Sequence, residues 1–389
     1  MDRVPAPAHD SLSPAERRRF LETNPDCYLT VTRSPEDLAP GQVWDAEEAL
    51  EASRTALDRL LAAGAFTSPE TPALYLYRLT ADGHCQVGFV GGVSVDDYDR
   101  GTVRIHEQIK AVRASHLATQ LDELGVQSSP ITLAHKPNES IAETAAAIVA
   151  TDQPVIAVTS ADGLRQEVWE VTDSSTIATV TDALADEFLY LIDGHHRAAA
   201  ASAHRARVEP GTGEGGADLM LCAVFPSTQL KNEAFHRCVN GVDPTELIAT
   251  LEAATTVRSV DTIDEVLDRR SDELALWTGD RWQLVTPPSA RESSPLEALD
   301  PVRLERHVLW PLLGIDESNP SGQLSYRHGM ADRADLEQLQ TLSSGAVWAM
   351  RPVPMETLMA VSDEGLTMPP KSTYFVPKVR SGVFLRSVR

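Results

Sequence analysis

An apolar run in the middle of the sequence ends in a short cluster of polar and charged residues. The run Tyr190–Ile192 leads into Asp193–Arg197, which reads Asp-Gly-His-His-Arg, and an alanine-rich stretch follows. Gly194 would let the chain turn sharply between a strand and a helix, and the first turn of a helix presents unpaired N–H groups that attract anions. The pattern therefore predicts a phosphate-binding turn. The alternative interpretation is an ordinary helix start capped by Asp193, with solvated histidines.

Within this turn we expect Arg197 to contribute most to phosphate binding. A guanidinium group is always charged and binds phosphate oxygens in a two-pronged manner, whereas imidazoles are only partly protonated near neutral pH. His196 is also a candidate catalytic residue. The predicted cofactor-binding residues of the turn are Asp193, Gly194, His195, His196 and Arg197.

A second polar segment lies upstream and combines acidic residues with a His-Glu pair. Gly91–Gly101 contains Asp96 and Asp97, and His106-Glu107 follows. Glu107, flanked by His106 and Arg104, is the predicted base that takes a proton from a substrate hydroxyl, with His106 as a second catalytic candidate. Asp96 and Asp97 are the predicted Mg²⁺ ligands, because this hard cation prefers carboxylate oxygens. The alternatives are a plain acidic turn and a surface network of salt bridges.

A third segment, Met368–Lys378, stands near the C-terminus and is rich in proline and hydroxyl residues. Two of the five lysines in the chain fall in it, although 34 residues are basic, and lysine and arginine are not interchangeable at phosphate sites. We expect the prolines to hold the segment extended. The alternative is a terminal strand that packs for structure alone. The predicted phosphate-binding residues are Lys371, Ser372, Thr373 and Lys378.

The residues Gly211–Gly216 match the glycine spacing of a dinucleotide-binding turn, but their context is wrong. That motif requires a strand before it and a helix after it. Here Arg-Val-Glu-Pro precedes the glycines, and a strand-like run, Leu219–Phe225, follows. We therefore expect a surface loop that binds no ligand.

Strand-like and helix-like patterns interleave without a strict alternation, which predicts a mixed α/β (α+β) fold. Ser13, Pro14 and Glu16 indicate the capped start of a helix. Two strands are expected at 73–80 and 84–95, around the turn Ala81-Asp82-Gly83. We expect a core domain over residues 1–240 with the first two motifs, and a C-terminal α/β region over residues 241–389 whose third motif completes the site.

The net charge of −23, from 34 basic and 57 acidic residues, disfavours a nucleic-acid partner, because such binding depends on basic side chains that displace counterions. The four cysteines form no Cys-x-x-Cys pair, so we expect buried thiols rather than a zinc site. The sequence shows neither a signal peptide nor an apolar run of membrane-spanning length. We therefore expect a soluble, cytoplasmic protein without a membrane partner.

Together, the three segments resemble the DUF1015 family. Its members carry a strand ending in Asp-Gly-His-His-Arg, an upstream Ser-Val-Asp-Asp-Tyr-Asp segment with a later His-Glu, and a C-terminal Met-Pro-Pro-Lys-Ser-Thr-Tyr-Phe segment, and all three stand here in that order. Residues 4–10 and 24–29 are also similar to the family, so the resemblance covers nearly the whole chain. The chain departs from the family pattern at His9, at Gln108 and at Ser115-His116, and these departures bear on the identity of the substrate.

The Asp-Gly-His-His-Arg turn resembles, more loosely, the helix-start motif of the ParB/sulfiredoxin superfamily. That resemblance implies a ParB/sulfiredoxin-like core with additional α/β elements and a helix start that binds nucleotide phosphates. It also implies a relation to kinases that phosphorylate free serine.

These observations predict a nucleotide-dependent phosphotransferase that acts on a small hydroxyl compound, with free L-serine as the first substrate to test. Phosphoryl transfer needs positioning, charge neutralisation and a base. We expect ATP or ADP and Mg²⁺ as cofactors, and Glu107, Arg197 and Lys371 around one cleft. The alternative function is a nucleotide-binding regulatory protein that hydrolyses slowly or not at all. Whether the chain forms a homodimer stays open.

Overall fold

The chain divides into two compact units. The computed structural model describes residues 4–7, 9–34, 37–38, 44–208, 216–288, 294–316, 322–342 and 345–389. Unit 1 comprises Met1–Ile105, Ile109–Leu230 and Pro377–Arg389, and unit 2 comprises His106–Gln108 and Lys231–Val376. The sequence predicts a boundary near residue 240. In the structure, the chain passes from unit 1 to unit 2 between Leu230 and Lys231. Each unit also takes a short segment from the other half of the chain.

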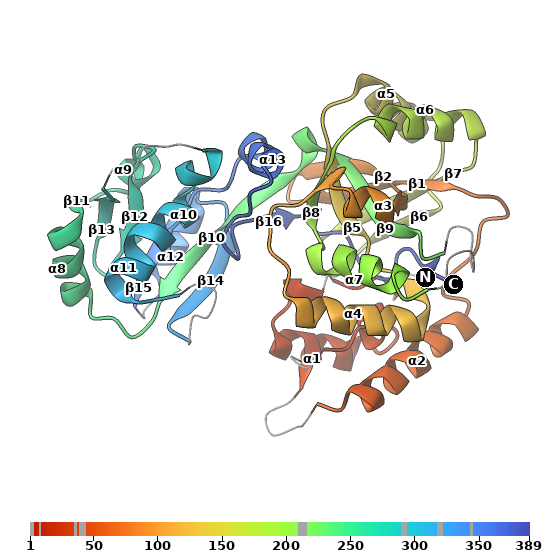
Figure 1. Ribbon diagram of the computed structural model, residues 1–389, viewed down its shortest axis with the longest axis horizontal. Helices are drawn as coiled ribbons and strands as arrows, with labels where there is room; N and C mark the ends of the chain where they lie inside the picture. The colour runs from red at the N-terminus through yellow and green to blue at the C-terminus, as the bar shows by residue number, and fades with distance from the viewer. Residues whose placement is uncertain are drawn as a thin grey trace. The chain divides into compact units, whose positions relative to one another are not determined.

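Unit 1 is built on one large mixed sheet (Figure 1). Among the described residues it has eight strands in the order β3-β8-β5-β9-β2-β1-β7-β6. The pairs β3–β8 and β5–β9 are parallel, and the other neighbours are antiparallel. The strands are β1 Leu74–Ala81, β2 His84–Ser94, β3 Val103–Arg104, β5 Ile131–His135, β6 Ile156–Thr159, β7 Arg165–Val171, β8 Leu189–Asp193 and β9 Leu219–Pro226, with β4 Val126–Gln127 and β17 Arg386–Ser387 as a separate pair.

The helices of unit 1 pack on this sheet and on one another. Ile141 and Val180, from α5 and α6, join a core with β1, β2 and β7, whereas Ala198 and Ala201 of α7 pack against β5, β8 and β9. Helix α4 packs along α7. The helices are α1 Pro14–Thr23, α2 Ala46–Ala62, α3 Val95–Asp99, α4 Ala111–Leu124, α5 Glu139–Thr151, α6 Ser174–Ala185 and α7 His195–Arg205.

Unit 2 contains a second, antiparallel sheet in the order β11-β13-β12-β15-β10-β14, with β16 also paired to β10. Its strands are β10 Lys231–Val239, β11 Thr256–Val260, β12 Leu274–Trp277, β13 Trp282–Thr286, β14 Leu324–Gly329, β15 Ala346–Ala349 and β16 Tyr374–Val376. Its helices are α8 Pro244–Ala254, α9 Ile263–Leu267, α10 Asp300–Leu304, α11 Trp310–Leu313, α12 Arg333–Gln340 and α13 Met355–Asp363, and a π-helical turn, Glu305–Leu309, joins α10 to α11.

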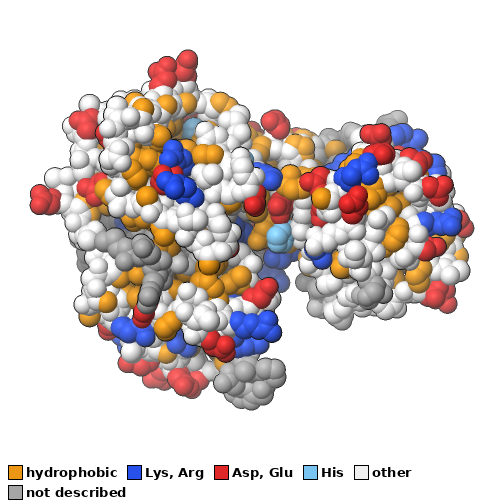
Figure 2. Space-filling model, turned by 180° about the vertical axis from the view of Figure 1, so that it is seen from behind, with side chains coloured by type: hydrophobic (Ala, Val, Ile, Leu, Met, Phe, Trp, Pro, Cys, Tyr) orange, Lys and Arg blue, Asp and Glu red, His pale blue; other side chains and the backbone are white. Residues whose placement is uncertain are grey.

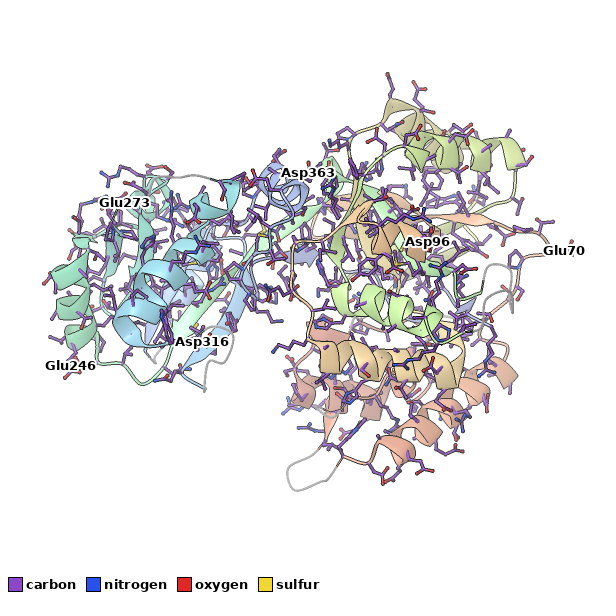
Figure 3. The ribbon with its side chains drawn as sticks, in the orientation of Figure 1. Glu70, Asp96, Glu246, Glu273, Asp316 and Asp363 are labelled. Atoms are coloured by element: carbon purple, nitrogen blue, oxygen red, sulfur yellow. The ribbon has the colours of Figure 1, made fainter. Side chains whose placement is uncertain are left out.

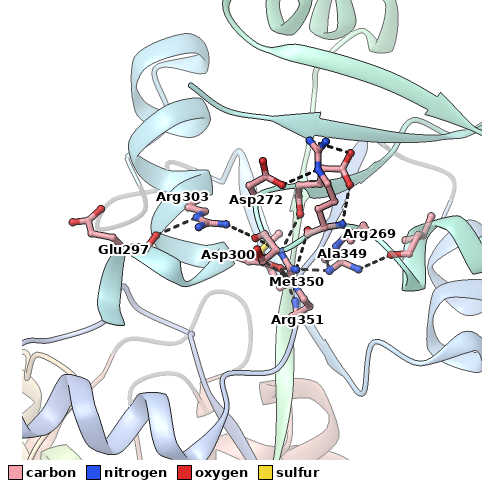
Figure 4. A network of polar contacts seen from close by, with 12 residues as sticks. Arg269, Asp272, Glu297, Asp300, Arg303, Ala349, Met350 and Arg351 are labelled. Carbon is pink, nitrogen blue, oxygen red and sulfur yellow. Dashed lines mark hydrogen bonds and ion pairs between the residues drawn. The ribbon is translucent and has the colours of Figure 1, made fainter. Parts of the chain in front are cut away.

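A polar network ties the end of β15 to the start of α10 in unit 2 (Figure 4). The Asp300 carboxylate accepts from the backbone N–H of Arg351 at 2.9 Å and from its guanidinium at 2.5 Å. Arg269 Nη2 donates to Asp300 at 3.4 Å and to the Ala349 carbonyl at 3.2 Å. Because buried charges require partners, the three charged residues Asp300, Arg269 and Arg351 have a structural explanation, and we assign them no function.

The prediction of a mixed α/β fold is confirmed, since helices cover a sheet with both parallel and antiparallel pairs in unit 1 and an antiparallel sheet in unit 2. The local signals behind it are confirmed too. Ser13 and Glu16 form the predicted capping box of α1, and β1 and β2 pair through Ala81 and His84 around the predicted turn.

The surface and the cysteines agree in part with the sequence-based expectations. Asp and Glu side chains are spread over the face shown in Figure 2. Cys27 and Cys222 are buried as predicted, but Cys85 is exposed, because its side chain points away from the core of β2. Within the described ranges, every helix is too short or too polar to cross a membrane.

Candidate functional site

The turn between β8 and α7 has the predicted strand-to-helix geometry. β8 ends at Asp193, Gly194 takes the left-handed conformation with φ 100°, and α7 begins at His195. The cap residue is Gly194, so the alternative interpretation with Asp193 as the cap is wrong. The Gly194 carbonyl accepts from the N–H groups of Arg197 and Ala198, which starts the helix within one residue of the strand.

Gly194→Ala should destabilise the protein by about 1–2 kcal/mol, because an L side chain is strained at positive φ. A Cβ at this position would also stand 2.9 Å from Arg197 Cζ. Gly163→Ala is the matched control, since Gly163 has φ +83° and a Cβ there would meet nothing within 4 Å. Urea unfolding of both variants separates backbone strain from crowding. If both variants lose the same free energy of unfolding, Gly194 has no role in making room for Arg197.

Asp193 lies between two cations from different parts of the sequence. Arg197 Nη2 is 2.5 Å from Asp193 Oδ2, and Lys378 Nζ is 3.1 Å from Asp193 Oδ1. Burial would raise the pKa of the Asp193 carboxyl, but Lys378 and then Arg197 outweigh it and hold this pKa well below its usual range. The third motif therefore contacts the first one within unit 1, through Lys378.

Arg197 is engaged by the protein more fully than the sequence suggests. Its Nη1 donates to the carbonyls of Ser129 and Pro130 at 2.7 and 2.6 Å, in addition to the contact of Nη2 with Asp193. We predict from sequence that Arg197 is the main phosphate ligand and that its loss leaves the fold intact. The phosphate role stays a prediction, but these contacts argue against a harmless Arg197→Ala, because they tie α7 to the start of β5.

The two histidines of the turn differ in their surroundings. His195 is buried. His196 Nε2 accepts a hydrogen bond from the backbone N–H of Lys110 at 3.0 Å, so the neutral ring carries its hydrogen on Nδ1. Burial, and then the charges of Arg113 and Lys110, lower the pKa of His196 to about 4. At neutral pH, His196 is therefore a hydrogen-bond donor through Nδ1–H rather than a base.

The second and third motifs contact each other within unit 2. The N–H of Met368 donates to the carbonyl of His106 at 2.8 Å, and Glu107 and Met368 form a parallel bridge. The buried His106 ring is joined to Thr373 by a 3.3 Å hydrogen bond between Nε2 and Oγ1. The backbone of Glu107 is thus fixed by the segment that carries Lys371.

The segment Met368–Lys378 is not extended throughout, contrary to the prediction. Lys371 takes the left-handed conformation with φ 57°, and the buried Ser372 hydroxyl donates to the Pro369 carbonyl at 2.7 Å, which closes a turn. The exposed Lys371 ammonium stands 5.2 Å above the centre of the Phe235 ring. Ser372 therefore has a structural role in the turn, and ligand binding by Lys371, Ser372 and Thr373 stays a prediction.

Asp96 is paired with arginines in this structure, and Mg²⁺ binding by Asp96 and Asp97 stays a prediction. Asp96, labelled on α3 in Figure 3, pairs with Arg205 of α7 and, at 3.0 Å, with Arg100. These guanidinium groups occupy the oxygens that a cation would need. Among the described residues, no group of three or more His, Cys, Asp or Glu side chains could hold a metal ion. The pair of Asp96 with Arg205 also helps to hold α3 on α7.

Some residues near the turn were missed by reasoning from sequence. Lys110 and Arg113 lie beside His196, and the only available signal was that Lys110 is one of five lysines in the chain. Gly211–Gly215 lie outside the described residues. Gly216, expected on the surface, is buried against the backbone of Val388 and Arg389, and its carbonyl accepts from Arg386 at 2.8 Å.

These features define a mixed α/β protein with a cation-rich turn between a strand and a helix. The chain belongs to the family described as "Protein of unknown function (DUF1015)", whose model matches residues 1–302. The resemblance to this family is thereby confirmed, over residues that include the first two motifs but not Met368–Lys378. The curated proteins offer no match.

Several solved structures are similar to this chain at low sequence identity. A mutant of free serine kinase in complex with AMP is 14% identical with a TM-score of 0.43, and the match covers 77% of this chain and 92% of that chain. A conserved hypothetical protein from Pyrococcus furiosus is 15% identical with a TM-score of 0.39, covering 75% and 93%. SbnI with a C-terminal truncation, from Staphylococcus aureus, is 14% identical with a TM-score of 0.39, covering 75% and 85%. TM-scores below 0.5 are too low to assign a ligand or an activity to this chain.

Proposed function

We propose that this protein is a nucleotide-dependent phosphotransferase acting on a small hydroxyl compound, with free L-serine as the first acceptor to test. The observation that carries the proposal is the contact of Lys378 with Asp193, which joins two motifs 185 residues apart at one helix start. Two cations against one carboxylate leave net positive charge at the turn, in a chain whose net charge is −23. Such a turn favours a phosphate group.

The reaction we propose is the attack of the acceptor hydroxyl oxygen on the terminal phosphorus of ATP or ADP. The bond from that phosphorus to the bridging oxygen breaks, the shortened nucleotide leaves, and the hydroxyl proton passes to Glu107. Phosphoryl transfer depends mainly on positioning and charge stabilisation, which suits the fixed backbone of Glu107.

The test is nucleotide consumption by the purified full-length chain. ATP and ADP are each offered with L-serine, with other hydroxyl amino acids, with small sugars, and alone, and products are followed by ³¹P NMR. We expect consumption only when the right acceptor is present, together with a new phosphate-ester signal. Binding of nucleotide without consumption for any acceptor would refute the phosphotransferase and favour a regulatory protein.

A further inference from the structure

The cations that the motif itself supplies are largely occupied by the protein. Three of the five guanidinium N–H groups of Arg197 are directed at Ser129, Pro130 and Asp193. The Lys378 ammonium is bound to the other oxygen of Asp193, and the Lys378 side chain is only 11% exposed. Both side chains shape the turn, and a ligand arriving from solvent would find few of their donors.

Two other cations stand next to the turn without a carboxylate partner in the part of the chain that the structure describes. Lys110 and Arg113 are exposed, in the first residues of α4 and directly before it. Several other arginines of unit 1 do form ion pairs, for example Arg205 with Asp218 at 2.8 Å. In a chain with 57 acidic residues, two neighbouring cations without an acidic partner form a site of local positive potential.

His196 connects these cations to the turn. Its Nε2 is held by the Lys110 N–H, and the charges of Arg113 and Lys110 reach its ring strongly enough to lower its pKa, although burial has the larger effect. The ring therefore offers Nδ1–H as a donor beside two positive side chains. A phosphate accepts hydrogen bonds from each of these three groups, and charged donors give the stronger ones.

We propose that Lys110, Arg113 and the Nδ1–H of His196 hold a phosphate group of the ligand, whereas Arg197 and Lys378 fix Asp193 and shape the turn. This inference rests on the proposed function, which it deepens by naming the residues that bind the phosphate. Lysine suits the position because its compact ammonium carries three donors on a long, flexible stem.

The experiment is calorimetric titration of the full-length chain with pyrophosphate and with ATP, at two salt concentrations. Lys110→Ala and Arg113→Ala should each weaken pyrophosphate binding by about tenfold, since a hydrogen bond to a charged group is worth roughly that much. Lys136→Ala is the matched control, because Lys136 is also an exposed lysine of unit 1. Asp193 pairs with Thr132 near the start of β5, whereas Lys136 follows the other end of that strand. The affinity of Lys136→Ala for pyrophosphate should stay within about twofold of that of the parent. Pyrophosphate binding by the parent should weaken at the higher salt concentration.

The outcomes separate this inference from the proposed function. Unchanged pyrophosphate affinity in both Lys110→Ala and Arg113→Ala, or no binding of either probe by the parent, would overturn it. Loss of pyrophosphate binding in these variants, with no hydroxyl acceptor consuming nucleotide in the parent, would keep the phosphate site and reject the phosphotransferase. A shift of the His196 ring signals in NMR on addition of pyrophosphate is expected in the parent, and Arg113→Ala should need about ten times more pyrophosphate to reach the same shift.

Discussion

Glu107→Gln should leave nucleotide binding intact and lower kcat by about 100- to 10,000-fold, the range that a general base contributes. Glutamine keeps the size and hydrogen-bonding shape of the side chain but cannot take a proton. The backbone of Glu107 is fixed by its bridge to Met368, and the His106 carbonyl accepts from the same residue. The fold should therefore tolerate the change, so that kcat falls while KM for the nucleotide stays close to that of the parent.

Glu364→Gln is the matched control for this variant, because Glu364 is an exposed carboxylate of the same unit at the end of α13. It should retain the activity of the parent. Steady-state kinetics with the acceptor found in the nucleotide screen, together with calorimetric binding of ATP or ADP, gives both quantities. An unchanged kcat would show that another group takes the proton. Loss of nucleotide binding would instead place Glu107 among the residues that hold the ligand.

Local signals in the sequence predict those parts of the fold whose cause is local. The capping box of Ser13 and Glu16 acts within four residues, and the turn at Asp82-Gly83 acts within one hairpin, so both are confirmed. Helix α6 was not predicted, because Ile177, Val180 and its threonines are β-branched and lower helix propensity. There, packing of Val180 against β1 and β7 outweighs the local preference.

In the candidate site, too, the features with a local cause could be predicted from the sequence, and those that depend on distant segments could not. The glycine turn before α7 follows from the motif, because only a residue that tolerates positive φ fits between strand and helix at Gly194. The partners of Arg197 could not be predicted, since Ser129 and Pro130 come from a segment about 70 residues upstream whose place depends on sheet order. The position of Lys110 beside His196 likewise depends on how α4 packs on α7.

Asp193→Ala should lower the free energy of unfolding by about 2–4 kcal/mol, more than any other single change considered for this turn. Breaking a buried ion pair from one side costs about 3–5 kcal/mol, because the remaining charge is left without its partner. Asp193 is 23% exposed, and water can reach part of the vacated space, so the loss should fall somewhat below that range. Two cations, Arg197 and Lys378, would lose their shared carboxylate. Asp193→Asn, which keeps the shape but not the charge, should cost less.

The loss of stability in Asp193→Ala should also depend on pH, in a direction set by the lowered pKa of Asp193. The unfolded-state pKa of an aspartate is about 3.9, and the folded-state value lies below it, so the carboxylate contributes its full stability above roughly pH 5. As the pH falls below about 4 toward the folded-state value, that contribution is lost. The difference in stability between the parent and Asp193→Ala should therefore be largest near neutral pH and shrink in acid. Urea unfolding at pH 7 and near pH 3 measures it, with Asp182→Ala, an exposed aspartate of α6, as the control. A difference that stays constant with pH would show that Asp193 contributes through packing rather than through its charge.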